Sequence, residues 1–160
     1  MGATIGILQA GGLNFPCSLG RGGRKRLKRE GDGATPTGTW QLRRLFHRAG
    51  RMPPPRAWRP SRPIRATDGW CETVGDRNYN RLVRLPYATA HETMRRGDHL
   101  YDIVVELSHN ERPRVQGKGS AVFFHLRRED GGPTAGCIAV SKRDMKIILG
   151  MCGRKTKIVV

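Results

Sequence analysis

The stretch FFHLRREDGGPTAGCIAV, residues Phe123–Val140, places a histidine and a cysteine twelve positions apart on either side of a turn-forming segment. The apolar run Ala121–Phe124 predicts a buried strand that ends at His125. The residues Ile138–Val140 predict a second short strand that begins just after Cys137. Two reactive side chains at neighbouring strand ends favour a hydrolytic or acyl-transfer site between them.

The residues around the cysteine suit nucleophilic chemistry. The thiolate is the reactive form, and an ordinary thiol with a pKa of about 8.5 is only a few per cent ionised at neutral pH. His125 is the residue that would accept the thiol proton. Thr134, Ala135 and Gly136 precede Cys137, and small residues allow a sharp bend that presents backbone N–H groups to an oxyanion. A small buried cysteine and a packed core histidine fit the spacing too, so this structural alternative stays open.

The arrangement of a histidine, a variable stretch and then [ST]-x-G-C resembles the signature of the L,D-transpeptidases with a YkuD-type catalytic domain. A second stretch upstream, KREGDGATPTGTWQL at residues 28–42, is similar to the T-P-x-G-x-[FWY] hairpin of that family. Three further stretches resemble a divergent proteobacterial branch: DGWC (68–71), RNYNRLVRLP (77–86) and HLYDIVVELSHN (99–110). The resemblance extends over most of the chain from Gly20 onward.

The resemblance implies a mainly β fold, a YkuD-like sandwich or barrel-type catalytic domain with about two short helices. A chain of 160 residues is long enough to bury its own core, so we expect residues 1–160 to form this single domain. It implies no metal and no cofactor. The four cysteines show no metal-ligand spacing, which agrees with that expectation.

The resemblance also implies a mechanism on the peptide stems of peptidoglycan. Cys137 would form a thioester with a donor stem and transfer it to an amine of an acceptor stem, giving a 3-3 or 1-3 cross-link. The carbonyl of Gly136 or the hydroxyl of Thr134 would orient His125, and backbone N–H groups around Ala135 would stabilise the oxyanion. Water as the acceptor would instead give L,D-carboxypeptidase activity with the same catalytic residues. Carbapenems would acylate the thiol.

The sequence departs from many relatives near the cysteine. Those relatives have a histidine before the glycine and an arginine two positions after the cysteine, where this chain has Ala135 and Ala139. Arg127 or Arg128 would take over the binding of a substrate carboxylate, because the planar guanidinium matches a carboxylate. Both arginines also fit as solvated loop charges. Further candidates for the substrate cleft, each with a competing structural role, are Tyr79, Asn80, Trp70, Glu92 and Tyr101.

Charge supports a rival interpretation from a different class. Thirty Lys and Arg residues against thirteen Asp and Glu give a formal net charge of +17, and basic residues cluster in Arg21–Arg29. Such a surface attracts nucleic acid or another anionic polymer. The chain shows no recognition-helix, zinc-finger or RNP-type pattern, so we expect no specific nucleic-acid partner. A basic nucleic-acid-binding domain remains the alternative to an enzyme that acts on the envelope.

Peptidoglycan lies outside the cytoplasmic membrane, so the resemblance implies a periplasmic or envelope location. Residues 1–10 lack the basic and long apolar regions of a signal peptide, and no apolar stretch approaches the roughly twenty residues of a membrane span. Removal of a leader and a different location both fit. We expect a monomer with at most one disulfide among Cys17, Cys71 and Cys152, or with all cysteines reduced.

Hydrophobic patterning predicts the remaining elements. Strands are expected at Ala3–Leu8, Leu13–Cys17, Thr39–Leu45, Tyr101–Leu107 and Thr156–Val160. Helices are expected at Ala90–Arg96 and at Ser141–Leu149, the latter closed by Gly150. The proline-rich segment Arg48–Pro63 predicts an irregular excursion with Trp58 packed back onto the domain, and Asp76–Asn80 predicts a turn.

Overall fold

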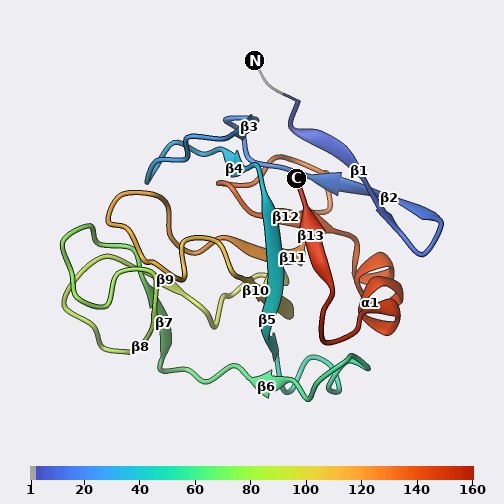
Figure 1. Ribbon diagram of the computed structural model, residues 1–160. Coiled ribbons are helices and arrows are strands. Elements are labelled where there is room, and N and C mark those ends of the chain that lie inside the picture. Colours follow the sequence, from blue (N-terminus) through green and yellow to red (C-terminus); the bar gives the residue numbers. More distant parts are fainter. Residues whose placement is uncertain (1–2) are drawn as a thin grey trace.

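A mixed eight-stranded sheet forms the centre of the computed structural model, which describes residues 3–160 (Figure 1). Seven strands follow one another in the order β1-β2-β12-β11-β10-β5-β13, and β6 pairs with β5. Their bounds are β1 Ile5–Ala10, β2 Leu13–Ser18, β5 Thr39–His47, β6 Arg62–Pro63, β10 Ile103–Leu107, β11 Phe123–Leu126, β12 Ile138–Val140 and β13 Lys157–Val159. The mainly β fold predicted from the sequence is confirmed.

The opening hairpin and the later strands match the predicted runs with shifted ends. β1 and β2 pair antiparallel around the turn at Gly11 and Gly12, both of which have positive φ. β11 continues through His125 to Leu126, whereas the sequence placed the end of this strand at the histidine. The histidine therefore lies within the sheet, where its backbone is fixed by neighbours on both sides.

Alternation along the central strands divides the buried residues between two faces, because successive strand residues point in opposite directions. Ile103 and Val105 of β10 pack in one cluster with Phe124. Val104 and Phe123 pack in a second cluster, which also contains Cys137. The cysteine therefore belongs to the second face of the sheet.

The single helix of the described chain, α1 (Lys142–Met151), covers the first face. Its N-cap is Ser141, whose side chain accepts a hydrogen bond from the N–H of Asp144. Its buried residues Met145, Ile148 and Leu149 join the first cluster. The helix was predicted correctly except at its end, because Gly150 lies inside it and Cys152 is the C-cap.

The second predicted helix, at Ala90–Arg96, is wrong. These residues contain β9 (His91–Thr93), which pairs with β7 (Asp68–Cys71) in a three-stranded sheet completed by β8 (Leu82–Arg84). Ala, Glu, Met and Arg favour helices locally, but pairing with β7 and burial of Met94 override that preference. Residues 3–160 therefore contain one helix where the sequence predicted two.

The remaining segments are mostly irregular. The short parallel pair β3 (Arg24–Lys25) and β4 (Thr35–Pro36) interrupts the basic glycine-rich loop. Trp58 packs against the first cluster, as predicted for the proline-rich excursion. All four cysteines are free. No helix within residues 3–160 is long and apolar enough to cross a membrane.

Candidate active site

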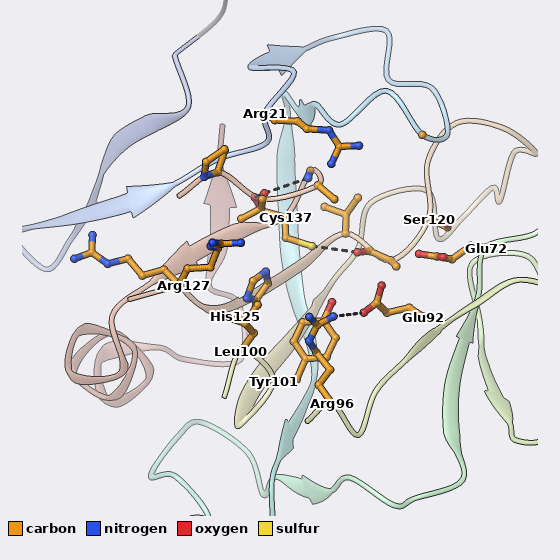
Figure 2. A pocket seen from close by; sticks show the side chains of 18 of the residues that line it. Arg21, Glu72, Glu92, Arg96, Leu100, Tyr101, Ser120, His125, Arg127 and Cys137 are labelled. Atoms are coloured by element: carbon orange, nitrogen blue, oxygen red, sulfur yellow. Dashed lines mark hydrogen bonds and ion pairs between the residues drawn. The ribbon is translucent and has the colours of Figure 1, made fainter. Parts of the chain in front are cut away.

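Strand pairing brings the two reactive side chains into one cavity. β11 and β12 pair in parallel with His125 opposite Ala139, so Cys137 lies just before the strand that neighbours the histidine. Both residues line a cavity of about 360 Å³ (Figure 2). The cavity lies on the second face of the sheet, so the sheet fixes the backbone beneath both groups.

The sulfur of Cys137 is held by backbone groups of the segment before β11. Its S–H donates to the carbonyl of Ala121 at 3.3 Å, and the N–H of Phe123 donates to Sγ at 3.3 Å. Cys137 is 8% exposed, and burial is the main cause that raises its pKa to about 12. The resting group is therefore a neutral thiol.

The imidazole of His125 is oriented by its own strand. Nδ1 lies 2.7 Å from the carbonyl oxygen of Leu126, which can only accept, so Nδ1 carries the proton and Nε2 is left as the basic nitrogen. Burial lowers the pKa of His125 to about 4, so the ring is neutral at neutral pH. The ring of Tyr101 packs edge-on at 5.2 Å. The predicted orienting groups, the carbonyl of Gly136 and the hydroxyl of Thr134, do not make this bond.

Thr134 and Gly136 instead shape the turn before the nucleophile. The hydroxyl of Thr134 donates to the carbonyl of Cys137 at 2.7 Å and accepts from the N–H of Gly136 at 3.1 Å. Gly136 has φ +139°, and a Cβ there would lie 2.9 Å from the carbonyl oxygen of Ala34. Only glycine fits this close approach of two backbones.

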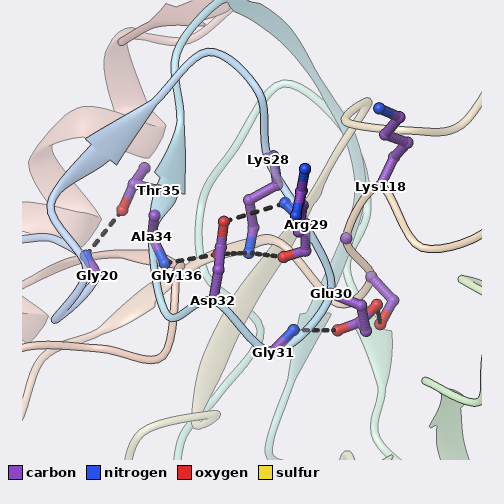
Figure 3. A network of polar contacts seen from close by, with 12 residues as sticks. Gly20, Lys28, Arg29, Glu30, Gly31, Asp32, Ala34, Thr35, Lys118 and Gly136 are labelled. Carbon is purple, nitrogen blue, oxygen red and sulfur yellow. Dashed lines mark hydrogen bonds and ion pairs between the residues drawn. The ribbon is translucent and has the colours of Figure 1, made fainter.

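The upstream motif forms the wall behind this turn (Figure 3). Lys28 is 6% exposed and forms an ion pair with Asp32, which also accepts from the N–H of Ala34 at 2.9 Å. The hydroxyl of Thr35 accepts from the N–H of Gly20 at 2.8 Å and lies 3.4 Å from the carbonyl of Cys137. The two sequence motifs therefore meet at one turn, although Thr35 and Cys137 lie 102 positions apart in the sequence.

Three residues expected in the substrate cleft lie behind the cavity. Trp70, Tyr79 and Asn80 are at most 7% exposed, and none of them lines it. The Oδ1 atom of Asn80 accepts from Nε1 of Trp70 and from the N–H of Ala121. The hydroxyl of Tyr79 donates to Glu30. These side chains form the hydrogen bonds that hold the segment in contact with the sulfur, so in this structure they support the cavity from behind.

One side of the cavity is basic. Arg127 and Arg128 both line it, as does Ala135. Arg128 forms an ion pair with Asp130 at 2.7 Å, whereas the side chain of Arg127 has no ion pair within residues 3–160. Arg21 also lines the cavity without such a pair, and sequence reasoning had placed it only in a general basic cluster. Arg127 and Arg21 are therefore cavity-lining cations without an ion pair among the described residues.

The opposite side of the cavity is acidic. The sequence predicted few of the residues on this side. Glu30, Glu72 and Glu92 line the cavity, and only Glu92 had been a candidate. Figure 2 shows Glu72 and Glu92 directed into the cavity on the side away from Arg127. Burial, followed by the charges of Glu92 and Glu30, raises the pKa of Glu72 to about 7. Tyr101, the other aromatic candidate, also lines the cavity.

Comparison with known families agrees with this geometry. The model of the YkuD family, described as an L,D-transpeptidase catalytic domain, matches residues 7–160. The chain belongs to this family. The match covers essentially the whole chain, so the YkuD-type domain accounts for the large sheet, the helix and the cavity together. Comparisons with curated proteins and with solved structures give no match.

Proposed function

We propose that this L,D-transpeptidase domain cross-links peptidoglycan stems through a thioester on Cys137. The observation that carries the proposal is that Cys137, just before β12, and His125, within the adjacent strand β11, line one cavity of a YkuD-family domain. Arg127, which lines the same cavity and has no ion pair among residues 3–160, supports binding of a substrate carboxylate, in place of the arginine that is alanine at position 139.

In the first half-reaction the sulfur attacks the carbonyl carbon of the third stem residue. Nε2 of His125 accepts the thiol proton and passes it to the amine of the departing terminal D-residue. A C–S bond forms and a C–N bond breaks, which leaves a thioester on Cys137. Backbone N–H groups of the turn at residues 135–137 stabilise the oxyanion, and each such donor is worth about 3 kcal/mol.

The resting protonation states of Cys137 and His125 determine when the proton moves in this step. A thiol with a pKa near 12 and an imidazole with a pKa near 4 do not form an ion pair before substrate arrives. Proton transfer must therefore accompany attack on the carbonyl. For this to occur, the sulfur exchanges its hydrogen bond to Ala121 for one to His125 when substrate fills the cavity.

In the second half-reaction an amine of an acceptor stem attacks the thioester, and the C–S bond breaks as the new amide forms. Peptidoglycan is found in the cell envelope, so an envelope location is part of the proposal. Water in place of the amine yields a shortened stem without a cross-link.

Mass spectrometry of a purified disaccharide-tetrapeptide incubated with the enzyme tests the proposal. Dimers that require Cys137 are the expected product, and their fragmentation identifies the bond. The Cys137→Ala variant should give no product, whereas Cys152→Ala, at the far end of α1, should remain active. Tripeptide alone would redefine the enzyme as an L,D-carboxypeptidase. Turnover by Cys137→Ala would remove the thioester mechanism.

A further inference from the structure

Glu72 is a carboxylate in the active-site cavity that the acylation step does not use. It follows β7 directly and lines the cavity together with Cys137 and His125 (Figure 2). Its side chain is half-buried. Among the hydrogen bonds and ion pairs of residues 3–160, none involves the carboxylate of Glu72. Its oxygens are therefore available to a bound molecule.

The neighbouring carboxylates are already engaged. Oε1 of Glu92 accepts from Arg96 at 2.9 Å. Oε2 of Glu30 accepts from the hydroxyl of Tyr79 and, at 2.8 Å, from the hydroxyl of Ser120. The charges that act on Glu72 come from Glu92, Glu30 and His91, and the two glutamates favour its protonated form. A cation that enters the cavity relieves this repulsion, which makes this side of the cavity suited to an ammonium group.

The second half-reaction needs such a group and a second base. An alkyl amine with a pKa of about 10.4 is almost wholly an ammonium ion at neutral pH, and an ammonium ion has no lone pair with which to attack. His125 handles the proton that ends on the sulfur. The ammonium ion must lose a further proton before attack, and this proton needs an acceptor other than His125.

We propose that Glu72 binds the acceptor ammonium group and removes its first proton, so that Glu72 selects an amine over water as the acceptor. The inference rests on the proposed thioester mechanism. The ammonium N–H transfers its proton to the Glu72 carboxylate, and the neutral amine then attacks the thioester carbon. As the C–N bond forms and the C–S bond breaks, a second amine proton passes through His125 to the sulfur. Glu72 then releases its proton to water.

The acid-base behaviour of Glu72 suits this role. A carboxyl group with a pKa near 7 is about half ionised at neutral pH, so it can accept a proton and return it to solvent in each cycle. A base of ordinary carboxylate pKa would accept the proton of an ammonium ion far less readily. The burial that raises its pKa therefore makes Glu72 a stronger base within the cavity.

The test separates acylation from transfer with the variant Glu72→Gln, which keeps the size of the side chain and removes the base. Thioester formation from a tetrapeptide donor is followed by intact mass, and the thioester is then partitioned between an added stem amine and water. We expect acylation within about threefold of wild type and a dimer-to-tripeptide ratio lowered by about 100-fold, the usual size of a general-base contribution. Glu111→Gln, whose carboxylate pairs with Arg43 and does not line the cavity, should leave the ratio unchanged.

A pH series supplies a readout that a structural role would not affect. In Glu72→Gln the dimer-to-tripeptide ratio should recover above about pH 10, where the amine loses its proton without help. An unchanged ratio in Glu72→Gln at pH 7, or a low ratio that does not recover with pH, would overturn the inference. Wild-type enzyme that forms the thioester but gives only tripeptide would overturn it too. Failure of wild type to form any thioester would instead refute the proposed function.

Discussion

Replacement of Asn80 by alanine should remove the support beneath the nucleophile. Oδ1 of Asn80 accepts from Nε1 of Trp70 at 2.9 Å and from the N–H of Ala121 at 3.1 Å. Its Nδ2 donates to the carbonyls of His109 at 3.2 Å and Asn110 at 3.0 Å. Asn80 is 7% exposed, so water does not replace these bonds when the side chain is removed.

The expected loss of folding stability comes from the four groups that Asn80 bonds. Each buried partner left without a hydrogen bond costs about 1 kcal/mol or more, which gives about 4 kcal/mol for the four. Asn80 also has φ 54°, a left-handed conformation that asparagine tolerates and that costs alanine about 1 kcal/mol more. The free energy of unfolding should therefore fall by about 5 kcal/mol, which matches the whole stability of a marginal domain.

Urea denaturation followed by tryptophan fluorescence measures this loss. Asn78→Ala is the matched control, because its Nδ2 makes a single bond, to the hydroxyl of Tyr87, at a partly exposed position. It should lower the free energy of unfolding by about 1 kcal/mol or less. A loss below about 2 kcal/mol for Asn80→Ala would refute the argument that the Asn80 bonds are buried and unreplaced.

Three further outcomes follow from the cavity. Burial raises the pKa of Cys137 to about 12, so the rate of its alkylation by iodoacetamide should rise about tenfold per pH unit from pH 7 to 10. Intact mass measures this rate, and a plateau below pH 9 would contradict the prediction. Because the pKa of His125 is about 4 when folded and about 6.5 when unfolded, its protonation favours unfolding between these values. As the pH falls from 6.5 to 4, wild type should lose about 3 kcal/mol more stability than His125→Gln in urea titrations, and parallel losses would be the contrary result. Gly136→Ala forces a Cβ against Ala34 and should slow thioester formation, measured by intact mass, by about 100-fold. Gly97→Ala, where a Cβ meets nothing within 4 Å, should leave the rate unchanged. Equal rates for the two variants would exclude the predicted crowding.

Much of the sheet was predictable because its strands carry their own pattern. The nearly continuous apolar run of β10, interrupted only by Glu106, indicated burial on both faces, and all five of its residues are buried. The strand within Ala90–Arg96 was not predictable in this way. Its residues favour a helix locally, but pairing with β7 stabilises a strand, and the local sequence does not indicate that β7 is the partner. Gly150 likewise fits inside α1 because it faces open space.

The site was predictable where residue type fixes the chemistry and obscure where it does not. The histidine–cysteine motif predicts Cys137 and His125 as candidate catalytic residues, and the structure brings both to one cavity. Tyr79 and Asn80 have side chains that suit a ligand or a buried hydrogen bond equally, and only the packing of distant segments decides which. Glu72 gave no signal in the sequence and Arg21 appeared only within a basic cluster, since their positions at the cavity depend on how two irregular segments fold over the sheet.

The parallel pairing of β11 with β12 has a consequence for how this enzyme diversifies. Parallel neighbours need a crossover between them, and here residues 127–137 supply it as a loop that also forms one side of the cavity. His125 lies in β11 and Cys137 directly precedes β12, so both are anchored at the sheet and lie outside residues 127–133. Sequence change in residues 127–133 can therefore reshape that side of the cavity while the sheet keeps the backbone beneath Cys137 and His125 fixed, so the shape of the cavity and the histidine–cysteine pair can evolve separately.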